Sequence, residues 1–193
     1  RVERLQRFRD QQDPRIGQRT RVFIMSLLGT LWTLTPVARA LLGDATEEQA
    51  WIGFAATPLV FAGLFGALLY WARDSMTRTA VNRRTAWSVA TLLVFQETLV
   101  AAAWRLDLPV DALLPLMMVL WGLVSAMAAI AVDRRLLPTA MAQMVALAVT
   151  LSHPAAGWWA AAGANFTFLV NGLVVWWPPP FRPPPADDGE APR

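Results

Sequence analysis

Cysteine and lysine are absent from this chain of 193 residues, and histidine occurs once, at His153. Without cysteine there can be no disulfide bond, no thiolate nucleophile and no cysteine-bound metal. A single histidine cannot form a histidine cluster, and the chain has no metal-ligand spacing, glycine-rich phosphate loop or nucleophile elbow. The sequence therefore predicts no metal, no cofactor and no catalytic site within these residues.

Hydrophobic residues make up 55% of the chain and charged residues 16%, which is too apolar for an ordinary soluble domain. The charged residues lie between long apolar runs instead of being spread evenly. This mixture is typical of a protein that crosses a membrane several times, because each helical span needs about 20 apolar residues. The sequence predicts one polytopic membrane domain of the all-α class, with the lipid bilayer around it.

Six apolar segments follow one another, most of them near the length that crosses the hydrocarbon core. The fifth is shorter than the others, so its length alone does not decide whether it crosses. The links are short, and short links place consecutive antiparallel helices side by side in an up-and-down bundle. Thr46, with Gln49 three residues later, predicts a capping box at the start of the second segment. The predicted transmembrane helices cover residues 22–43, 49–72, 85–105, 110–132, 136–152 and 156–177.

All 17 basic residues are arginines, and the net charge of +3 raises the question of a nucleic-acid partner. The arginines lie in the gaps between apolar segments, however, which indicates membrane topology and no nucleic acid. If both termini are cytoplasmic, fifteen of the seventeen arginines are cytoplasmic too, and only Arg39 and Arg105 lie elsewhere. The predicted cytoplasmic anchors are Arg19, Arg21, Arg83, Arg84, Arg134 and Arg135.

The chain divides into three parts by composition. Residues 1–21 place arginines around a thin apolar edge, which predicts a juxtamembrane basic helix and a connector. Residues 22–177 form the predicted six-helix transmembrane domain. Residues 178–193 are rich in proline and then acidic, which predicts a disordered tail. Since the sequence starts at Arg1 without a methionine, we expect it to be a piece of a longer protein.

Tryptophan positions give a second view of the spans, since indole rings favour the interface between membrane and water. Eight of the ten tryptophans lie near the ends of predicted segments. The remaining two, Trp32 and Trp121, lie near the middle of their segments. These two are expected either to pack in the core or to line a pocket.

Glu97 lies near the middle of the third predicted span, where a carboxylate is costly and is therefore a functional candidate. Counting about 1.5 Å per residue places Asn165 at the depth of Glu97. The same count puts Gln143 and Asn171 at a shared level nearer the cytoplasm. The predicted intramembrane polar network consists of Glu97, Gln96, Arg39, Asn165, Gln143 and Asn171.

Such a network has two interpretations. It is either a proton or ligand site, or a set of interhelical hydrogen bonds worth about 1 kcal/mol each that holds the bundle together. The structural interpretation is favoured because no second carboxylate stands near Glu97 to form a proton relay.

Pairs of small residues four apart occur in the second span, Ala62 with Gly66 and Gly63 with Ala67, and in the fourth span, Gly122 with Ala126. Small residues let helix backbones approach closely. They predict either tight packing within the bundle or the contact face of a homodimer.

The sequence RVERLQRFRD at residues 1–10 is followed by DPR and QRTR, then by the six spans and a proline-rich tail. With this order of features the chain resembles the carboxy-terminal membrane region of some bacterial Hanks-type serine/threonine protein kinases. The resemblance implies a location in a bacterial inner membrane and a cytosolic kinase domain upstream of Arg1. No kinase motif is present in these residues, so kinase activity would belong to the upstream part.

The links on the predicted outer side are too short to fold an extracellular sensor domain. The sequence therefore favours a membrane-embedded sensory and anchoring module of a signalling protein, with a cytosolic output domain in the same chain. The alternative is a small proton-coupled secondary transporter that uses Glu97. A lipid-modifying enzyme is disfavoured because no acid, base and nucleophile cluster together.

Overall fold

The computed structural model describes residues 17–43 and 46–177, and this part of the chain forms six long helices and no strand. The short helix α4 (Arg73–Met76) follows α3, and single 3-10 turns precede α6, α7 and α8. The long helices are α2 (Gln18–Leu42), α3 (Glu47–Trp71), α5 (Ala80–Arg105), α6 (Leu113–Ala131), α7 (Leu137–Ser152) and α8 (Gly157–Trp176).

The predicted spans are confirmed, since all six helices are long and apolar enough to cross a membrane by length and composition. The short fifth span is included, because its helix and the preceding 3-10 turn together cover Arg134–Ser152, 19 residues. The all-α class and the six membrane-length helices therefore stand as predicted. The predicted basic helix before Asp13 and the proline-rich tail after Trp177 lie outside the described residues.

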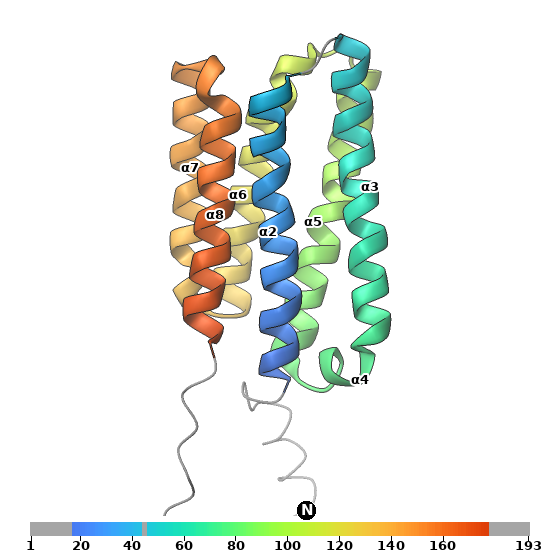
Figure 1. The fold of residues 1–193 in the computed structure, drawn as a ribbon, viewed down its shortest axis with the longest axis vertical. Coiled ribbons are helices and arrows are strands. Elements are labelled where there is room, and N and C mark those ends of the chain that lie inside the picture. Colours follow the sequence, from blue (N-terminus) through green and yellow to red (C-terminus); the bar gives the residue numbers. More distant parts are fainter. Residues whose placement is uncertain (1–16, 44–45, 178–193) are drawn as a thin grey trace, which may run out of the picture.

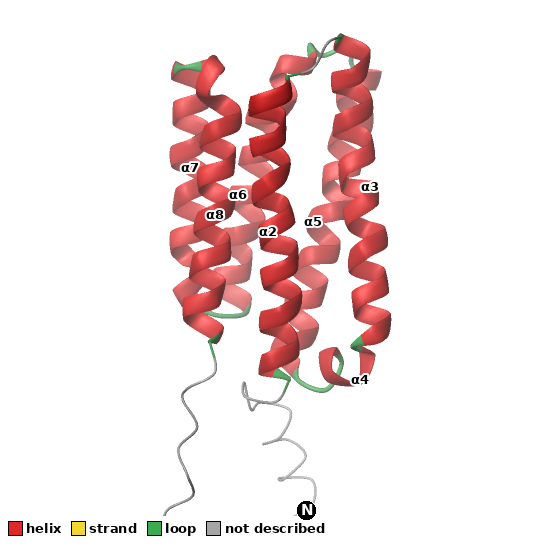
Figure 2. Ribbon diagram, viewed as in Figure 1, coloured by secondary structure: helices red, strands yellow, loops and turns green. Residues whose placement is uncertain are grey.

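The helices stand side by side in one upright bundle (Figures 1 and 2). Following the main contacts from helix to helix gives the order α2, α8, α7, α6, α5 and α3. The backbone of α2 lies much closer to α8 than to α3. Helices α2 and α3 meet through their side chains, in a core cluster that includes Ile24, Leu28, Phe61 and Phe65. Consecutive helices are therefore neighbours as predicted, but between α2 and α3 the backbones stay further apart than between α2 and α8.

Close approach of α2 to α8 depends on Gly29. A β-carbon at Gly29 would lie 3.2 Å from Cβ of Leu169 on α8, tighter than ordinary van der Waals contact. A residue without a side chain at this position lets the two backbones pack with little space between them.

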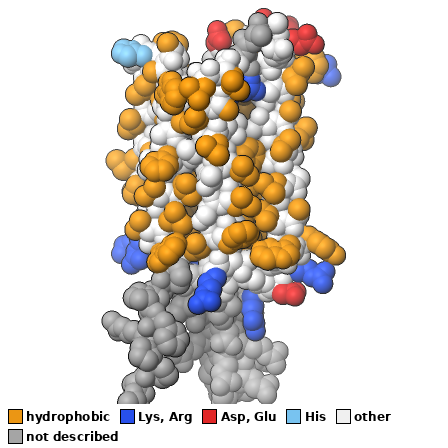
Figure 3. All heavy atoms as spheres, viewed as in Figure 1, with side chains coloured by type: hydrophobic (Ala, Val, Ile, Leu, Met, Phe, Trp, Pro, Cys, Tyr) orange, Lys and Arg blue, Asp and Glu red, His pale blue; other side chains and the backbone are white. Residues whose placement is uncertain are grey.

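One end of the bundle holds the first residues of α2 and the last residues of α8, and we call it the terminal end. The opposite end, where α2 ends and α8 begins, is the distal end (Figure 1). Arginines gather at the terminal end, and acidic side chains are seen mainly at the distal end (Figure 3). In the described residues the terminal end carries Arg19, Arg21, Arg73, Arg78, Arg83, Arg84, Arg134 and Arg135, whereas Arg39 and Arg105 lie toward the distal end.

The small residues of the second span face outward. Ala62, Gly63, Gly66 and Ala67 are all exposed, and a β-carbon at either glycine would meet no atom within 4 Å. These pairs therefore do not serve packing within the bundle. This placement is compatible with the other predicted role, an outward contact such as a homodimer.

Replacing Gly66 by leucine is expected to leave the stability of the monomer unchanged, because the new side chain projects into open space. If the outward face of α3 forms a homodimer, the same change weakens self-association, since leucine keeps two helix backbones apart. Thermal unfolding and a dilution series in detergent, followed by energy transfer between labelled copies, measure the two effects. Loss of monomer stability would contradict the outward placement.

Candidate functional site

Arg21 is buried in the first turns of α2, with 1% of its surface exposed. Its Nη1 donates a hydrogen bond of 2.6 Å to Oδ1 of Asn82 on α5. Its guanidinium carbon lies 5.3 Å from the centre of the Trp176 ring at the end of α8, a cation–π contact. One side chain thus joins three helices where the described chain begins.

The position of Arg21 follows from helical periodicity. Ile24, Met25 and Leu28 are buried on α2, three, four and seven residues after Arg21, so all four share one face. The other predicted anchors are exposed, whereas Arg21 is an interior residue of this face. The exposed anchors are Arg19, Arg83, Arg84, Arg134 and Arg135.

Asn82 connects Arg21 to the turn between α3 and α5. Its Nδ2 donates to the carbonyl of Ser75 in α4 at 2.8 Å, and its backbone N–H donates to Oγ1 of Thr79 at 3.2 Å, an N-cap. On the other side, Nε2 of Gln18 donates to the carbonyl of Trp176 at 2.9 Å. We call Arg21, Asn82 and Trp176, with these bonded neighbours, the arginine hub.

Gly17 lies against the hub, immediately before α2. Its φ of 72° is in the left-handed region, and a β-carbon there would lie 2.7 Å from Nδ2 of Asn82. We expect Gly17→Ala to lower the free energy of unfolding by about 1–2 kcal/mol, the cost of a left-handed backbone in an L-residue. Thermal unfolding in detergent measures this loss. An unchanged unfolding temperature would show that the turn before α2 is not held by the hub.

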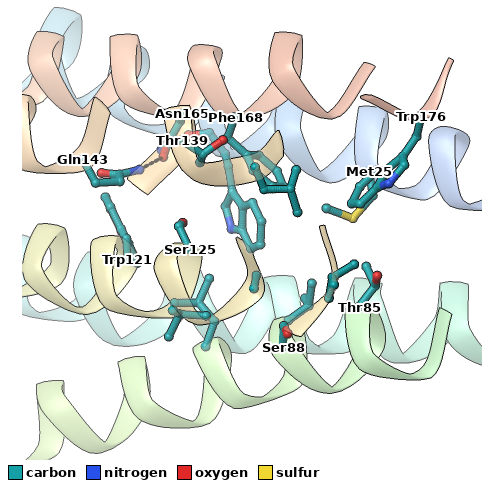
Figure 4. A pocket seen from close by; sticks show the side chains of 17 residues that line it. Met25, Thr85, Ser88, Trp121, Ser125, Thr139, Gln143, Asn165, Phe168 and Trp176 are labelled. Atoms are coloured by element: carbon teal, nitrogen blue, oxygen red, sulfur yellow. Dashed lines mark hydrogen bonds between the residues drawn. The ribbon is translucent and has the colours of Figure 1, made fainter. Parts of the chain in front are cut away.

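A cavity of about 80 Å³ lies beside the hub in the terminal half of the bundle, and we call it the terminal cavity (Figure 4). Met25 and Trp176 bound it near the hub, and Gln143 and Trp121 bound it near mid-bundle (Figure 4). Four aromatic rings line it, those of Trp32, Trp121, Phe168 and Trp176, and no charged side chain does.

The mid-bundle end of the terminal cavity is polar. Nε2 of Gln143 on α7 donates to Oδ1 of Asn165 on α8 at 3.1 Å, and Nδ2 of Asn165 donates to the carbonyl of Trp32 on α2 at 2.8 Å. Gln143 is 2% exposed, and its Oε1 has no hydrogen-bond partner among the described residues. This end therefore presents a buried acceptor.

A second cavity, of about 50 Å³, lies in the distal half, and we call it the distal cavity. Trp32, Trp121 and Asn165 line both cavities, so these three side chains form the wall between them. Arg39 and Gln96 also line the distal cavity. The two mid-span tryptophans thus line pockets, one of the two alternatives that their position left open.

Arg39 crosses toward α3 and α8 inside the distal cavity. Its guanidinium carbon lies 6.0 Å from the centre of the Trp158 ring. Gly53 on α3 makes room for it, since a β-carbon there would overlap the Arg39 guanidinium. The sequence could not predict this contact, because Gly53 and Arg39 lie on different helices and no periodic pattern connects them.

The structure brings part of the predicted polar network together. Gln143 bonds to Asn165, and Asn165 shares the distal cavity with Gln96 and Arg39. Asn171 bonds elsewhere, from Nδ2 to Oγ1 of Thr139 at 3.1 Å and to the carbonyl of Arg135 at 3.0 Å.

Glu97 lines neither of these two cavities. Its carboxyl lies next to the backbone of Leu59 on α3, and Leu59 itself is 60% exposed. One carboxyl oxygen of Glu97 has no hydrogen-bond partner among the described residues. The carboxyl therefore lies between α5 and α3 with one oxygen buried, apart from the Gln143–Asn165 pair.

Replacing Asn165 by leucine is expected to lower the free energy of unfolding by about 1–2 kcal/mol, because two interhelical hydrogen bonds are lost. Glu97→Gln is expected to cause no loss, since an amide is less costly in hydrocarbon than a carboxylate and one carboxyl oxygen has no partner to lose. Titration with denaturing detergent compares the two variants. A larger loss for Glu97→Gln would show that Glu97 holds the bundle together.

Chemically, the site offers binding and no obvious reaction. No group of three or more histidine, cysteine, aspartate or glutamate side chains that could hold a metal occurs in residues 17–43 and 46–177. No family model, curated protein or solved structure matches the chain. The arginine hub and the two cavities are therefore the features that bear on function.

Proposed function

We propose that this domain is the membrane-embedded sensory and anchoring module of a signalling protein, with its terminal end in the cytoplasm and an output domain upstream of Arg1. The arginine hub carries the proposal. It fixes the start of α2, where the upstream chain connects, to α5 and α8. The gathering of arginines at the terminal end supports the cytoplasmic orientation, because basic residues are retained on that side.

The hub also touches the terminal cavity. Trp176 contacts Arg21 and lines the cavity, and Met25 lines the cavity one turn after Arg21. A change in how the cavity is filled would move the Trp176 ring and so alter the support of Arg21. This gives a short physical route from the membrane interior to the start of α2.

The proposed output domain, which the resemblance suggests is a serine/threonine kinase of a bacterial inner-membrane protein, provides the functional test. The full-length protein is reconstituted in liposomes, and its output is compared with that of a form in which an inert membrane anchor replaces residues 22–177. We expect output or its response to the membrane to change. Identical output from both forms would contradict sensing and leave anchoring alone.

The absence of cysteine allows a direct test of coupling within this domain. Spin labels at Gln12→Cys and Arg135→Cys report the distance between the segment before α2 and the exposed turn before α7. Adding Asn82→Leu to this pair removes the hydrogen bond to Arg21. We expect the distance distribution to shift or broaden, and an unchanged distribution would contradict control of the upstream segment by the hub.

Two cavities separated by a thin wall also suit a small secondary transporter, the alternative proposal. Glu97 does not line either cavity, so it is poorly placed to couple protons to a solute that passes between them. Solute flux into proteoliposomes that disappears in Glu97→Gln would favour transport over signalling. The hub has no evident use in transport, and for this reason the signalling module is preferred.

A further inference from the structure

We propose that the terminal cavity is a binding site for a small uncharged aromatic molecule that carries one hydrogen-bond donor, such as a phenol. The inference goes beyond the proposed function, because binding at this site does not require that the domain signals. It rests on the lining of the cavity, on its buried acceptor and on its lateral wall.

The lining selects an aromatic body. Rings of Trp32, Trp121, Phe168 and Trp176 surround the cavity, and the rings of Trp32 and Phe168 lie 5.6 Å apart, centre to centre. Aromatic rings favour stacked or edge-to-face neighbours at such distances. A flat ring thus gains more contact here than a flexible chain of the same size.

The lining also selects against charge. None of the side chains around the terminal cavity is charged, and an ion without a partner is costly at this depth in a membrane. The distal cavity differs, since Arg39 lines it. An uncharged ligand therefore belongs in the terminal cavity.

The buried acceptor, Oε1 of Gln143, indicates that the ligand carries a hydrogen-bond donor. Oε1 of Gln143 lacks a partner among the described residues, and an unsatisfied buried oxygen is costly. Gln143 uses one of its two amide N–H groups on Asn165, and its Oε1 keeps its full capacity to accept. A hydroxyl donor at the mid-bundle end would satisfy this oxygen, with the ring directed toward Trp176.

The terminal cavity is smaller than such a ligand, and it can accept one only because its wall is open on one side. A volume of about 80 Å³ is less than the roughly 150 Å³ that hold benzene in a closed apolar core. On the α5 and α6 side, however, Ser88, Val124 and Ser125 remain partly exposed. The ring can therefore extend between these helices, and a ligand dissolved in the bilayer can reach the site.

Binding is tested with two fluorinated probes, 4-fluorophenol and 4-fluorotoluene, which differ in having a hydroxyl or a methyl group. Fluorine NMR follows their saturable binding to the full chain in lipid nanodiscs, with empty nanodiscs as the partition control. We expect 4-fluorophenol to bind about tenfold more tightly than 4-fluorotoluene. A factor of ten corresponds to about 1.4 kcal/mol, the size of one such hydrogen bond.

Three variants test whether the probes bind in the terminal cavity. Gln143→Leu should weaken 4-fluorophenol about tenfold and leave 4-fluorotoluene unchanged, whereas Gln96→Leu should affect neither. Gln96 is the matched control, since its Oε1 is also buried without a partner, but it lines the distal cavity. Ser125→Leu should abolish binding of both probes by filling the cavity, and it leaves the Gln143–Asn165 bond intact.

Equal 4-fluorophenol affinities of Gln143→Leu and Gln96→Leu would overturn the assignment of the acceptor. Normal binding by Ser125→Leu, or no saturation beyond empty nanodiscs, would overturn the site. Adding 4-fluorophenol to the spin-labelled pair at positions 12 and 135 separates this inference from the proposed function. Binding without a change in that distance would contradict sensing and leave the binding site in place.

Discussion

Asn82→Leu is expected to lower the free energy of unfolding by about 2–3 kcal/mol, the usual cost of losing a hydrogen bond to a buried charged group. The guanidinium of Arg21 would stay buried in the bundle while its 2.6 Å bond to Oδ1 of Asn82 disappears. The carbonyl of Ser75 would lose a donor at the same time. Thermal unfolding in detergent micelles measures the loss.

The control for this experiment is Arg83→Gln, in the next residue of α5. Arg83 is exposed, and its Nη1 donates to the carbonyl of Thr77 at 2.8 Å. Exposed substitutions of this kind change stability by about 0.5 kcal/mol or less. If Asn82→Leu proves as stable as Arg83→Gln, the arginine hub does not hold the terminal end of the bundle.

Gly29→Val is expected to have the second large effect, a loss of about 1–3 kcal/mol from overpacking between α2 and α8. A β-carbon at this position already lies 3.2 Å from Cβ and 3.2 Å from Cδ1 of Leu169, and 3.4 Å from its Cα. The two additional methyl groups of valine therefore force the helices apart along the contact that joins the first span to the last.

Gly163→Val on α8 is the matched control, because a β-carbon there meets no atom within 4 Å. Both substitutions carry the same change in helix propensity, so their difference isolates the contact with Leu169. Unfolding in increasing concentrations of denaturing detergent compares them. Equal stabilities would mean that α2 and α8 are not packed as closely as described.

The sequence predicted the number and approximate positions of the spans because these depend on hydropathy along the chain. Some helix starts differ, since α2 begins at Gln18 and α5 at Ala80, a turn before the predicted residues 22 and 85. The sequence also predicted the cap at Thr46, whose Oγ1 accepts from the backbone N–H of Gln49 at 3.2 Å. Such features are local, and each follows from a few neighbouring residues. The grouping of arginines at the terminal end is likewise a property of the links.

The faces of the helices were harder to predict. In water an apolar stripe marks the buried side of a helix, but in a membrane both the bundle interior and the lipid are apolar. Hydropathy therefore could not predict that Glu97 lies beside α3 and lines neither cavity, or that Gln143 bonds to Asn165. Arg21 is the exception, because Ile24 and Leu28 on the same face could have indicated that it points inward.

The packing of α2 against α8 also has a consequence for the order of assembly. A ribosome releases the first span long before the last, so Arg21 and Trp176 are separated by most of the domain during synthesis. Contacts between distant parts of a chain form late and slowly. Until α8 is inserted, Arg21 lacks its aromatic partner, and a chain truncated before α8 would hold this guanidinium by Asn82 on α5 without the Trp176 ring.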